Sequence, residues 1–283
     1  IFGPSSSGKT VLLAEIAGAV KRAGGEVMFK DPEARLNKAF AGIFDLNVDE
    51  IEYSVPSTVP EVFKPIRSWA PDGDFINGIF ADSLAALSTD MELEDKDQYG
   101  MRRAKEFSEQ LRKTCRVLTD KNFLMVVSNQ IRDNIGGGPF SEKFKTPGGF
   151  GIPFYSSLRL RMMGTQKIKK VVKVQGKEVR RVIGVKTDVE VYKSSIWSPF
   201  RIAPLTIIFD YGVDDLRQNL QYIKDFTSNK VYTVAGRTLG TSMIDAIGIV
   251  EDEGLEKRLK REVIKLWTTI EEQFEEQRKI KKR

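Results

Sequence analysis

The stretch Gly3-Pro4-Ser5-Ser6-Ser7-Gly8-Lys9-Thr10 lies between the apolar pair Ile1-Phe2 and an amphipathic run that continues to Arg22. It fits the pattern G-x4-G-K-S/T at every fixed position. Glycines let the backbone curl so that successive N–H groups point at phosphate oxygens, and a helix that begins after the loop adds the positive end of its dipole. A chance glycine-serine turn is the alternative, but a strand before the loop and a helix after it are the context that the motif requires. The stretch therefore predicts a phosphate-binding loop that opens an α/β fold.

A nucleotide in such a loop needs a metal ion and residues that hold it. We expect Lys9 to reach the β- and γ-phosphates and the Thr10 hydroxyl to bind Mg²⁺. Asp82 directly follows the buried apolar run 77–81, at the strand end where α/β sheets place ligand sites. The alternative is that Asp82 caps the next helix, a role that Ser83 can also fill. We predict that Thr10 and Asp82 are the metal ligands.

Hydrolysis also needs a group that orients the attacking water, and Glu33 is the candidate. It follows the apolar run 26–30 in the turn Asp31-Pro32-Glu33. In a doubly wound sheet that strand end faces the phosphate loop. A surface carboxylate in an Asp-Pro turn fits the spacing equally well, so the residues alone leave both interpretations open.

Short apolar runs alternate with amphipathic stretches in the first half of the chain, which is typical of a parallel sheet with crossover helices. We predict strands over 1–2, 26–30, 77–81 and 123–128, and helices over 11–22 and 99–120. Residues 131–150 hold seven glycines and prolines without periodicity, which predicts a mobile loop. Residues 158–192 alternate like a β-hairpin around Gln175-Gly176.

The pattern changes near Leu216 to a helix, a short hairpin over 231–239 and two final helices. The predicted fold is therefore an α/β P-loop core over residues 1–214, with a largely parallel central sheet flanked by helices. A small α+β domain follows over residues 215–283. Because the chain starts inside a predicted strand and without Met, we expect an N-terminal segment to be missing.

The composition excludes several kinds of chemistry. The 283 residues include no histidine and one cysteine, Cys115, so histidine-based catalysis, histidine-ligated metals and internal disulfides are excluded. Lysine and arginine number 45 against 39 acidic residues, and the net charge of +6 permits a polyanionic partner. No apolar stretch approaches the roughly 18 residues of a membrane span, so we expect no membrane partner.

Six segments resemble the RecA recombinase family in the same order along the chain. They are GPSSSGKT (3–10), DPEARLNKAF (31–40), GIFADSLAAL (78–87), VVSNQIR (126–132), TPGGFGIPFYSSLRLR (146–161) and VEVYKSSIWSPF (189–200). The resemblance implies a RecA-type fold and a DNA-dependent ATPase that uses ATP and Mg²⁺. It also implies a helical filament on single-stranded DNA, pairing with homologous duplex DNA, and a cytoplasmic location in a bacterial cell or phage-infected host.

The resemblance also implies roles for single residues around the nucleotide. Glu33 falls on the family's catalytic glutamate, and Gln130 on the glutamine that senses the γ-phosphate. Asn37 and Phe40 match positions that contact the adenine ring. Without the family, Gln130 and Asn37 would be interpreted as turn residues and Phe40 as core.

Contacts between subunits are implied at three further positions. Phe154 and Tyr155 resemble a subunit-contact pair, although either fits a core role. Lys193 matches one of two lysines that reach a neighbour's ATP. The second lysine of the family falls on Ser195 here, so the sequence leaves the strength of that contact open.

In this family two loops line the filament axis and hold single-stranded DNA, and here they correspond to about 91–103 and 131–149. The predicted DNA-binding residues are Arg102, Arg103, Arg132, Ile135, Gly136, Lys143, Lys145, Gly148 and Gly149. Mobile glycine-rich backbone and basic side chains suit phosphate binding. The first loop also carries four acidic residues, so we expect DNA near its Arg102 end.

The basic stretch 159–193 has two interpretations that the sequence leaves open: a second DNA site that receives duplex, or an edge hairpin protected by lysines. Two other functions also fit the predicted core. One is a ring helicase or ATPase, and the other is a recombination regulator that binds nucleotide without turnover.

Overall fold

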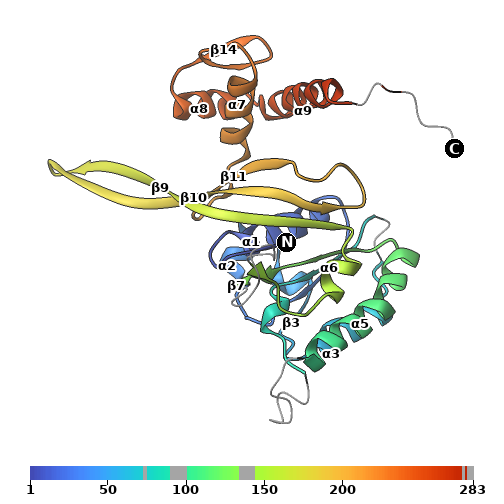
Figure 1. Cartoon of the computed structure of the whole chain (residues 1–283). Coiled ribbons are helices and arrows are strands. Elements are labelled where there is room, and N and C mark those ends of the chain that lie inside the picture. Colours follow the sequence, from blue (N-terminus) through green and yellow to red (C-terminus); the bar gives the residue numbers. More distant parts are fainter. Residues whose placement is uncertain (73–74, 90–100, 134–143, 276–277, 279–283) are drawn as a thin grey trace. The chain divides into compact units, whose positions relative to one another are not determined.

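The computed structural model describes residues 1–72, 75–89, 101–133, 144–275 and 278. The chain forms two compact units, Ile1–Val213 and Asp214–Arg283. The first contains a large sheet and the second is mainly helical (Figure 1).

One part of the sheet in the first unit is parallel. Its strands are β1 (Phe2–Gly3), β2 (Val27–Lys30), β3 (Glu52–Ser54), β4 (Gly78–Ala81), β5 (Leu124–Val127) and β6 (Asn129–Gln130). The order β3-β2-β4-β5 forms one ladder, and β1 pairs with β6 and β9 in another. Backbone bonds join the two ladders, because Ser128 N donates to Ala81 O and Asn129 N donates to Ile1 O, each at 2.9 Å. The predicted central sheet of mostly parallel strands is confirmed.

An antiparallel extension continues this sheet beyond β1. It consists of β9 (Leu158–Val174), β10 (Lys177–Ser194), β11 (Ile202–Ile208) and β12 (Gly212–Val213). The two long strands form the predicted hairpin, and its turn residues Gln175 and Gly176 have φ values of +49° and +79°. The hairpin extends as a ribbon well beyond the rest of the unit (Figure 1). Strands β11 and β12 were missed by the sequence prediction.

Helices cover both faces of the parallel ladder. They are α1 (Lys9–Arg22), α2 (Lys38–Gly42), α3 (Val59–Ser68), α5 (Met101–Asp120) and α6 (Gly151–Tyr155). Successive side chains of a strand point to opposite faces, so Phe29 joins the core beneath α1 while its neighbour Met28 joins the core beneath α3 and α5. Every residue of β2 and β4 is buried, which explains why both strands are apolar apart from Lys30 at the end of β2.

The predicted loop over 131–150 needs a correction at its ends. Strand β7 (Arg132–Asp133) pairs with β8 (Phe144–Lys145) in a short antiparallel ladder, while residues 134–143 lie outside the described part of the chain. The Phe144 ring lies 5.9 Å from that of Phe2 and 6.1 Å from that of Tyr192. These contacts join distant segments, so local glycine and proline content could not reveal them.

The second unit has its own core. It contains α7 (Asp215–Phe226), β13 (Tyr232–Val234), β14 (Arg237–Gly240), α8 (Met243–Asp252) and α9 (Glu256–Gln273). Leu220, Val234, Val250 and Leu259 pack together at its centre. The hairpin turns at Ala235-Gly236 as predicted. None of the helices that the structure describes is long and apolar enough to cross a membrane.

Candidate active site

The phosphate loop connects β1 to α1, and its glycines are required by the local structure. Gly8 has φ +91°, and a Cβ added to it would lie 2.3 Å from Ile207 Cδ1. A Cβ added to Gly3 would lie 2.5 Å from Met162 O. Ser7 is buried and its hydroxyl donates to Pro4 O at 2.9 Å. The loop is therefore held in one tight conformation by its neighbours.

Lys9 lies across this loop rather than in solvent. Only 8% of it is exposed, and Nζ donates to Gly3 O at 3.2 Å and to Pro4 O at 2.6 Å. Burial lowers the pKa of Lys9, while the negative charges of Asp82 and Glu33 act in the opposite direction. The loop lysine thus lies within the field of both predicted carboxylates.

Asp82 follows β4 and is buried, with 4% of its surface exposed. The Ser128 hydroxyl donates to Oδ1, whereas Oδ2 is buried without a hydrogen-bond partner. A buried carboxylate oxygen without a partner is unfavourable, and a hard cation such as Mg²⁺ satisfies it. Ser128, which the sequence analysis missed, orients this carboxylate from the position directly after β5, the strand that pairs with β4.

The metal set that the sequence predicts is small. Thr10 is half-buried at the second position of α1. Among the residues that the structure describes, no group of three or more His, Cys, Asp or Glu side chains is arranged around a metal site. A metal ion held by Thr10 and Asp82 would take its other ligands from phosphate and water, as Mg²⁺ commonly does.

Glu33 and Gln130 are brought together from separate strand ends. The Gln130 Nε2 donates to Glu33 Oε1 at 3.4 Å, and the Glu33 side chain is 14% exposed. The other carboxylate oxygen, Oε2, forms an ion pair with the Arg35 guanidinium. Sequence reasoning missed Arg35, because the two side chains come together only when the backbone between them turns at Ala34.

A buried carboxylate holds the turn that carries Glu33. Asp31 is 1% exposed, and its Oδ2 accepts hydrogen bonds from Leu36 N at 2.8 Å and from the Tyr53 hydroxyl at 3.0 Å. Burial, with the Asp31 charge and hydrogen bond, raises the pKa of Tyr53 to about 12. The sequence suggested only a turn opener at Asp31, since its partner Tyr53 comes from another strand.

The predicted adenine contacts have other partners within the chain. Asn37 Oδ1 accepts from Phe40 N at 2.9 Å and caps α2. The Phe40 ring packs edge-on against Phe44, with 5.1 Å between ring centroids. These are the turn and core roles weighed as alternatives, and contact with a base stays a prediction.

The Lys193 side chain also forms hydrogen bonds within its own chain. Its Nζ donates to Pro153 O at 2.8 Å and to Phe154 O at 3.2 Å, near the end of α6. The Phe154 side chain is 75% exposed, and Tyr155 is half-buried. Contact of Lys193 with a neighbour's nucleotide stays a prediction.

The predicted DNA-binding residues lie in different environments. Arg102 and Arg132 are exposed, and Arg103 Nη1 donates to Leu87 O at 3.1 Å. Lys145 lies in β8, opposite Arg132. Ile135, Gly136 and Lys143 lie outside the described residues.

Gly148 and Gly149 have a packing role. Their φ values are +93° and +68°, and added Cβ atoms would lie 2.5 Å from Ile152 Cδ1 and 2.7 Å from Ala104 Cβ. Both glycines therefore let the chain pass close to α5 and α6. Their contact with DNA stays a prediction.

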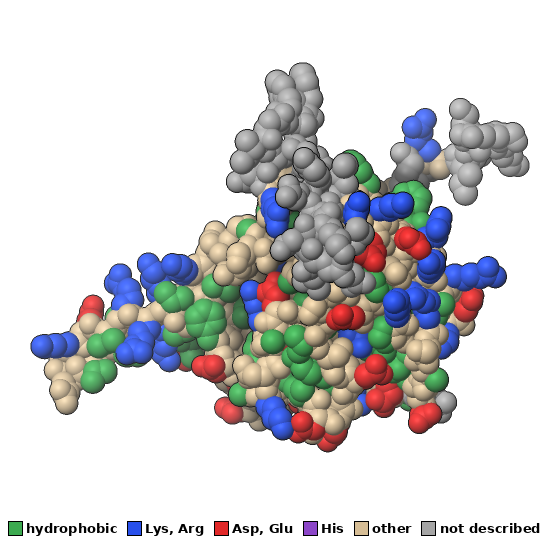
Figure 2. Space-filling view, turned by 90° about the horizontal axis from the view of Figure 1, so that it is seen from below, with side chains coloured by type: hydrophobic (Ala, Val, Ile, Leu, Met, Phe, Trp, Pro, Cys, Tyr) green, Lys and Arg blue, Asp and Glu red, His purple; other side chains and the backbone are tan. Residues whose placement is uncertain are grey.

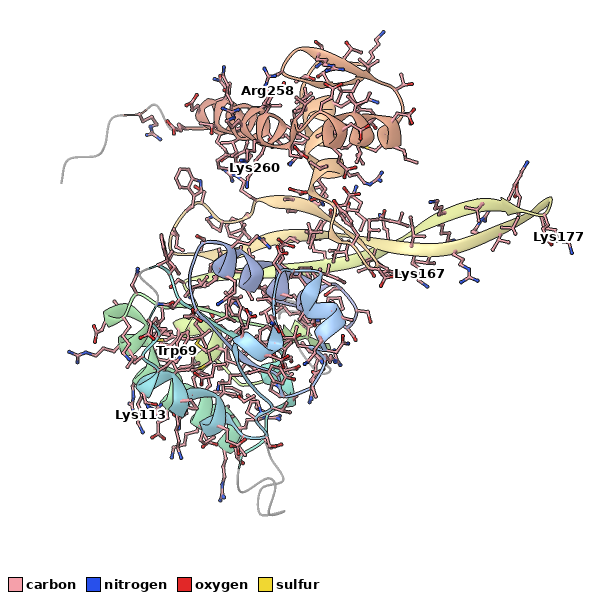
Figure 3. All side chains as sticks on the ribbon, turned by 180° about the vertical axis from the view of Figure 1, so that it is seen from behind. Trp69, Lys113, Lys167, Lys177, Arg258 and Lys260 are labelled. Carbon is pink, nitrogen blue, oxygen red and sulfur yellow. The ribbon has the colours of Figure 1, made fainter. Side chains whose placement is uncertain are left out.

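The β9–β10 ribbon concentrates positive charge. Lys and Arg side chains lie along its length in the space-filling view (Figure 2); Lys177 lies at its tip and Lys167 nearer its middle (Figure 3). Lys170 pairs directly with Arg181 across the strands, which is unfavourable unless an anion or solvent separates the charges. The arrangement suits an acidic partner and also suits a protected edge, so both interpretations persist.

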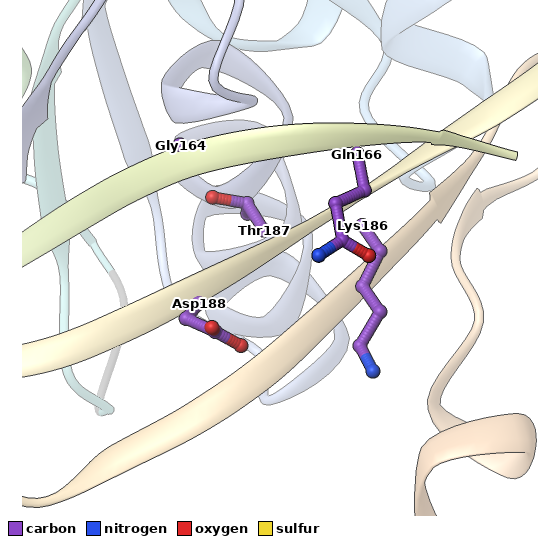
Figure 4. A pocket seen from close by; sticks show the side chains of 5 residues that line it. All are labelled: Gly164, Gln166, Lys186, Thr187 and Asp188. Carbon is purple, nitrogen blue, oxygen red and sulfur yellow. The ribbon is translucent and has the colours of Figure 1, made fainter.

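A small pocket of about 60 Å³ lies on the same ribbon (Figure 4). It is lined by Gly164, Gln166, Lys186, Thr187 and Asp188. None of these residues belongs to the strand-end cluster around Lys9. The predicted active site therefore depends on the loop and strand ends rather than on this hollow.

A largely parallel α/β sheet with a glycine-rich loop between its first strand and first helix defines the P-loop NTPase class. Residues 1–214 match the family model of the RecA N-terminal domain. The chain belongs to the RecA family.

Individual relatives agree with this assignment. The chain is 35% identical to the RecA protein of Thermus aquaticus over 219 residues, which are 76% of this chain and 61% of that protein. It is 33% identical to the RecA protein of Borrelia hermsii over 216 residues, 75% of this chain and 58% of that protein. The match to Acholeplasma laidlawii RecA is 29% over 262 residues, 89% and 75% of the two chains. The aligned region thus spans about three-fifths of the first two relatives.

Proposed function

We propose that this chain is the core of an ATP-dependent DNA recombinase. It would form helical filaments on single-stranded DNA and promote pairing and strand exchange with homologous duplex DNA. The observation that carries the proposal is the convergence of Lys9, Glu33, Asp82 and Gln130 at the carboxyl ends of neighbouring parallel strands. Relatives that share this region are named RecA, which supports the same activity.

The nucleotide would bind where the loop amides and Lys9 can meet its phosphates. Pro4, Ser5, Ser6 and Ser7 line the loop between the two fixed glycines. Lys9 would exchange its two carbonyl partners for phosphate oxygens, which are stronger acceptors for an ammonium group. Mg²⁺ would be held by Thr10 and Asp82, and it would neutralise charge on the phosphates.

Glu33 would orient the attacking water, and Gln130 would report the state of the nucleotide. Gln130 touches Glu33 on one side and is followed closely in sequence by Arg132 in β7. A change at the terminal phosphate could thus alter the segment predicted to hold DNA. Ordering of a segment by a phosphate contact is a common form of nucleotide switch.

Self-association is supported by exposed apolar side chains near α6 and the segment after β10. Phe150 is 93% exposed, Phe154 75%, Ile196 73% and Phe200 71%. Phe150 and Phe154 are one helical turn apart, and exposed apolar patches commonly mark interaction surfaces. A head-to-tail interface that does not close generates a helical filament.

The test combines turnover with imaging. We expect ATP hydrolysis that single-stranded DNA stimulates, and filaments in negative stain with DNA and a non-hydrolysable ATP analogue. Lys9→Ala should abolish nucleotide binding or turnover, whereas Lys38→Ala, at an exposed surface ion pair with Asp49, should not. Closed rings would favour a ring ATPase instead, and nucleotide binding without turnover in the unaltered chain would favour a regulator.

A further inference from the structure

Arg35 occupies one oxygen of the carboxylate that the proposed reaction needs. Its guanidinium pairs with Glu33 Oε2, while Gln130 donates to Oε1. Oε1 thus has an amide donor, whereas Oε2 is buried, accepts no hydrogen bond and is held by the charge of Arg35. A water molecule that used Oε2 as its acceptor would have to compete with Arg35.

The backbone holds Glu33 and Arg35 on a shared turn. Ala34, between them, has φ +51°, a left-handed conformation that is uncommon for a residue other than glycine. Ala34 N donates to Asp31 O at 3.0 Å, and Leu36 N donates to the buried Asp31 carboxylate at 2.8 Å. Unusual backbone held by surrounding contacts is frequent at functional sites.

The ion pair itself is easily broken. The Arg35 side chain is 58% exposed, so solvent screens its attraction to Glu33. A terminal phosphate offers more negative charge than a carboxylate that Gln130 already engages, and the planar guanidinium fork can pair with two phosphate oxygens as it does with a carboxylate. The positive charge of Arg35 is also among the causes that lower the pKa of Lys9, so its field extends to the phosphate loop.

We propose that Arg35 is a positioning residue that exchanges Glu33 for the terminal phosphate of the bound nucleotide. In the free chain Arg35 restrains the Glu33 carboxylate. When a triphosphate occupies the loop, Arg35 turns to the phosphate and releases Glu33 Oε2 to a water molecule. The exchange would make Arg35 a determinant of triphosphate over diphosphate binding. This inference rests on the proposed nucleotide site.

The test is a double-mutant cycle on nucleotide affinity in the full chain. Mg²⁺ with a non-hydrolysable ATP analogue and Mg²⁺ with ADP are titrated into the unaltered chain, Glu33→Gln, Arg35→Gln and the double variant. Glu33→Gln removes the competitor for Arg35, so we expect affinity for the ATP analogue to rise by about three- to tenfold. Most of this gain should vanish when Arg35→Gln is also present. ADP affinity should change by less than about twofold in every variant, because ADP lacks the terminal phosphate.

Two further variants make the result specific. Arg35→Lys keeps the positive charge and should retain part of the gain from Glu33→Gln. Arg116→Gln, at an arginine that is 88% exposed on α5, should leave both affinities unchanged. Thermal melting of each variant checks that it is folded.

The outcomes separate this inference from the proposed function. An equal gain from Glu33→Gln with and without Arg35 would overturn the exchange while leaving the nucleotide site intact. Equal losses of ATP-analogue and ADP affinity in Arg35→Gln would overturn it too. If the unaltered chain bound neither nucleotide, both the proposed function and the exchange would be wrong.

Discussion

The side-chain amide of Gln130 donates a hydrogen bond of 3.4 Å to the carboxylate of Glu33, although the two residues lie 97 positions apart. The contact joins Gln130, the last residue of β6, to Glu33 in the turn that follows β2. It gives the proposed water-orienting residue a direct connection to the strand that leads into the predicted DNA loop.

Gln130→Ala should therefore uncouple DNA from ATP turnover. We expect nucleotide affinity to stay within about twofold of the original, because no phosphate-loop contact is lost. Stimulation of hydrolysis by single-stranded DNA should fall by tenfold or more, about 1.4 kcal/mol of coupling. Turnover measured with and without DNA tests this, and unchanged stimulation would show that Gln130 carries no signal.

Asp82→Asn should weaken magnesium use. The change keeps the size of the side chain but removes the charge on the buried pair of oxygens, of which Oδ2 has no protein partner. We expect the Mg²⁺ concentration for half-maximal turnover to rise by about tenfold or more, because carboxylates are the preferred ligands of this ion. Asp120→Asn, on the exposed surface of α5, is the matched control and should leave the Mg²⁺ dependence unchanged.

The basic ribbon predicts a separable effect on duplex DNA. Alanine replacement of Lys167, Lys169 and Lys170 should reduce capture of duplex by a DNA-bound filament, with a shallower dependence on salt. Turnover on single-stranded DNA should persist, since these residues are remote from the strand-end cluster. The same charge change at Lys64, Lys105 and Lys113, exposed on α3 and α5, is the control. Undiminished duplex capture would leave the ribbon as a protected edge.

Gly18→Ala should destabilise the first unit. A Cβ at Gly18 would lie 1.9 Å from Phe44 O, so α1 must shift from the backbone that it contacts. We expect a loss of about 1–3 kcal/mol in the free energy of unfolding, the usual range for overpacking. Gly42→Ala is the control, because a Cβ there meets nothing within 4 Å and alanine favours helix. Chemical denaturation of both variants should show opposite signs.

Tyr53→Phe should alter stability at alkaline pH. The pKa of Tyr53 is raised from 10.0 to about 12 in the folded chain, so the unfolded chain ionises first. The neutral phenol contributes stability that is fully present below pH 10 and is lost as the pH rises towards 12. The unaltered chain should therefore be more stable than Tyr53→Phe below pH 10, and this difference in the free energy of unfolding should shrink as the pH rises from 10 to about 12. Parallel stability curves for the two proteins would show that Asp31 and burial do not hold the phenol neutral.

The sequence by itself determined the features that depend on near neighbours. The glycine-lysine-threonine order of residues 3–10 predicted a loop before a helix, and apolar runs predicted β2, β4 and β5. Alternation around Gln175-Gly176 predicted the long hairpin, and Gly176 suits the positive φ that this turn requires. The parallel sheet followed from the alternation of strands and helices.

Only the tertiary structure decided which side chains meet. Three side-chain contacts join segments that are distant in the sequence and come together only through the order of the strands. They are Gln130 with Glu33, Ser128 with Asp82, and Tyr53 with Asp31. Strand order is set by packing of the whole sheet, which a local hydrophobic pattern does not encode. The local sequence also fails to predict the Glu33–Arg35 ion pair, although the two residues are close in the chain. The pair requires the left-handed turn at Ala34, which buried Asp31 holds in place.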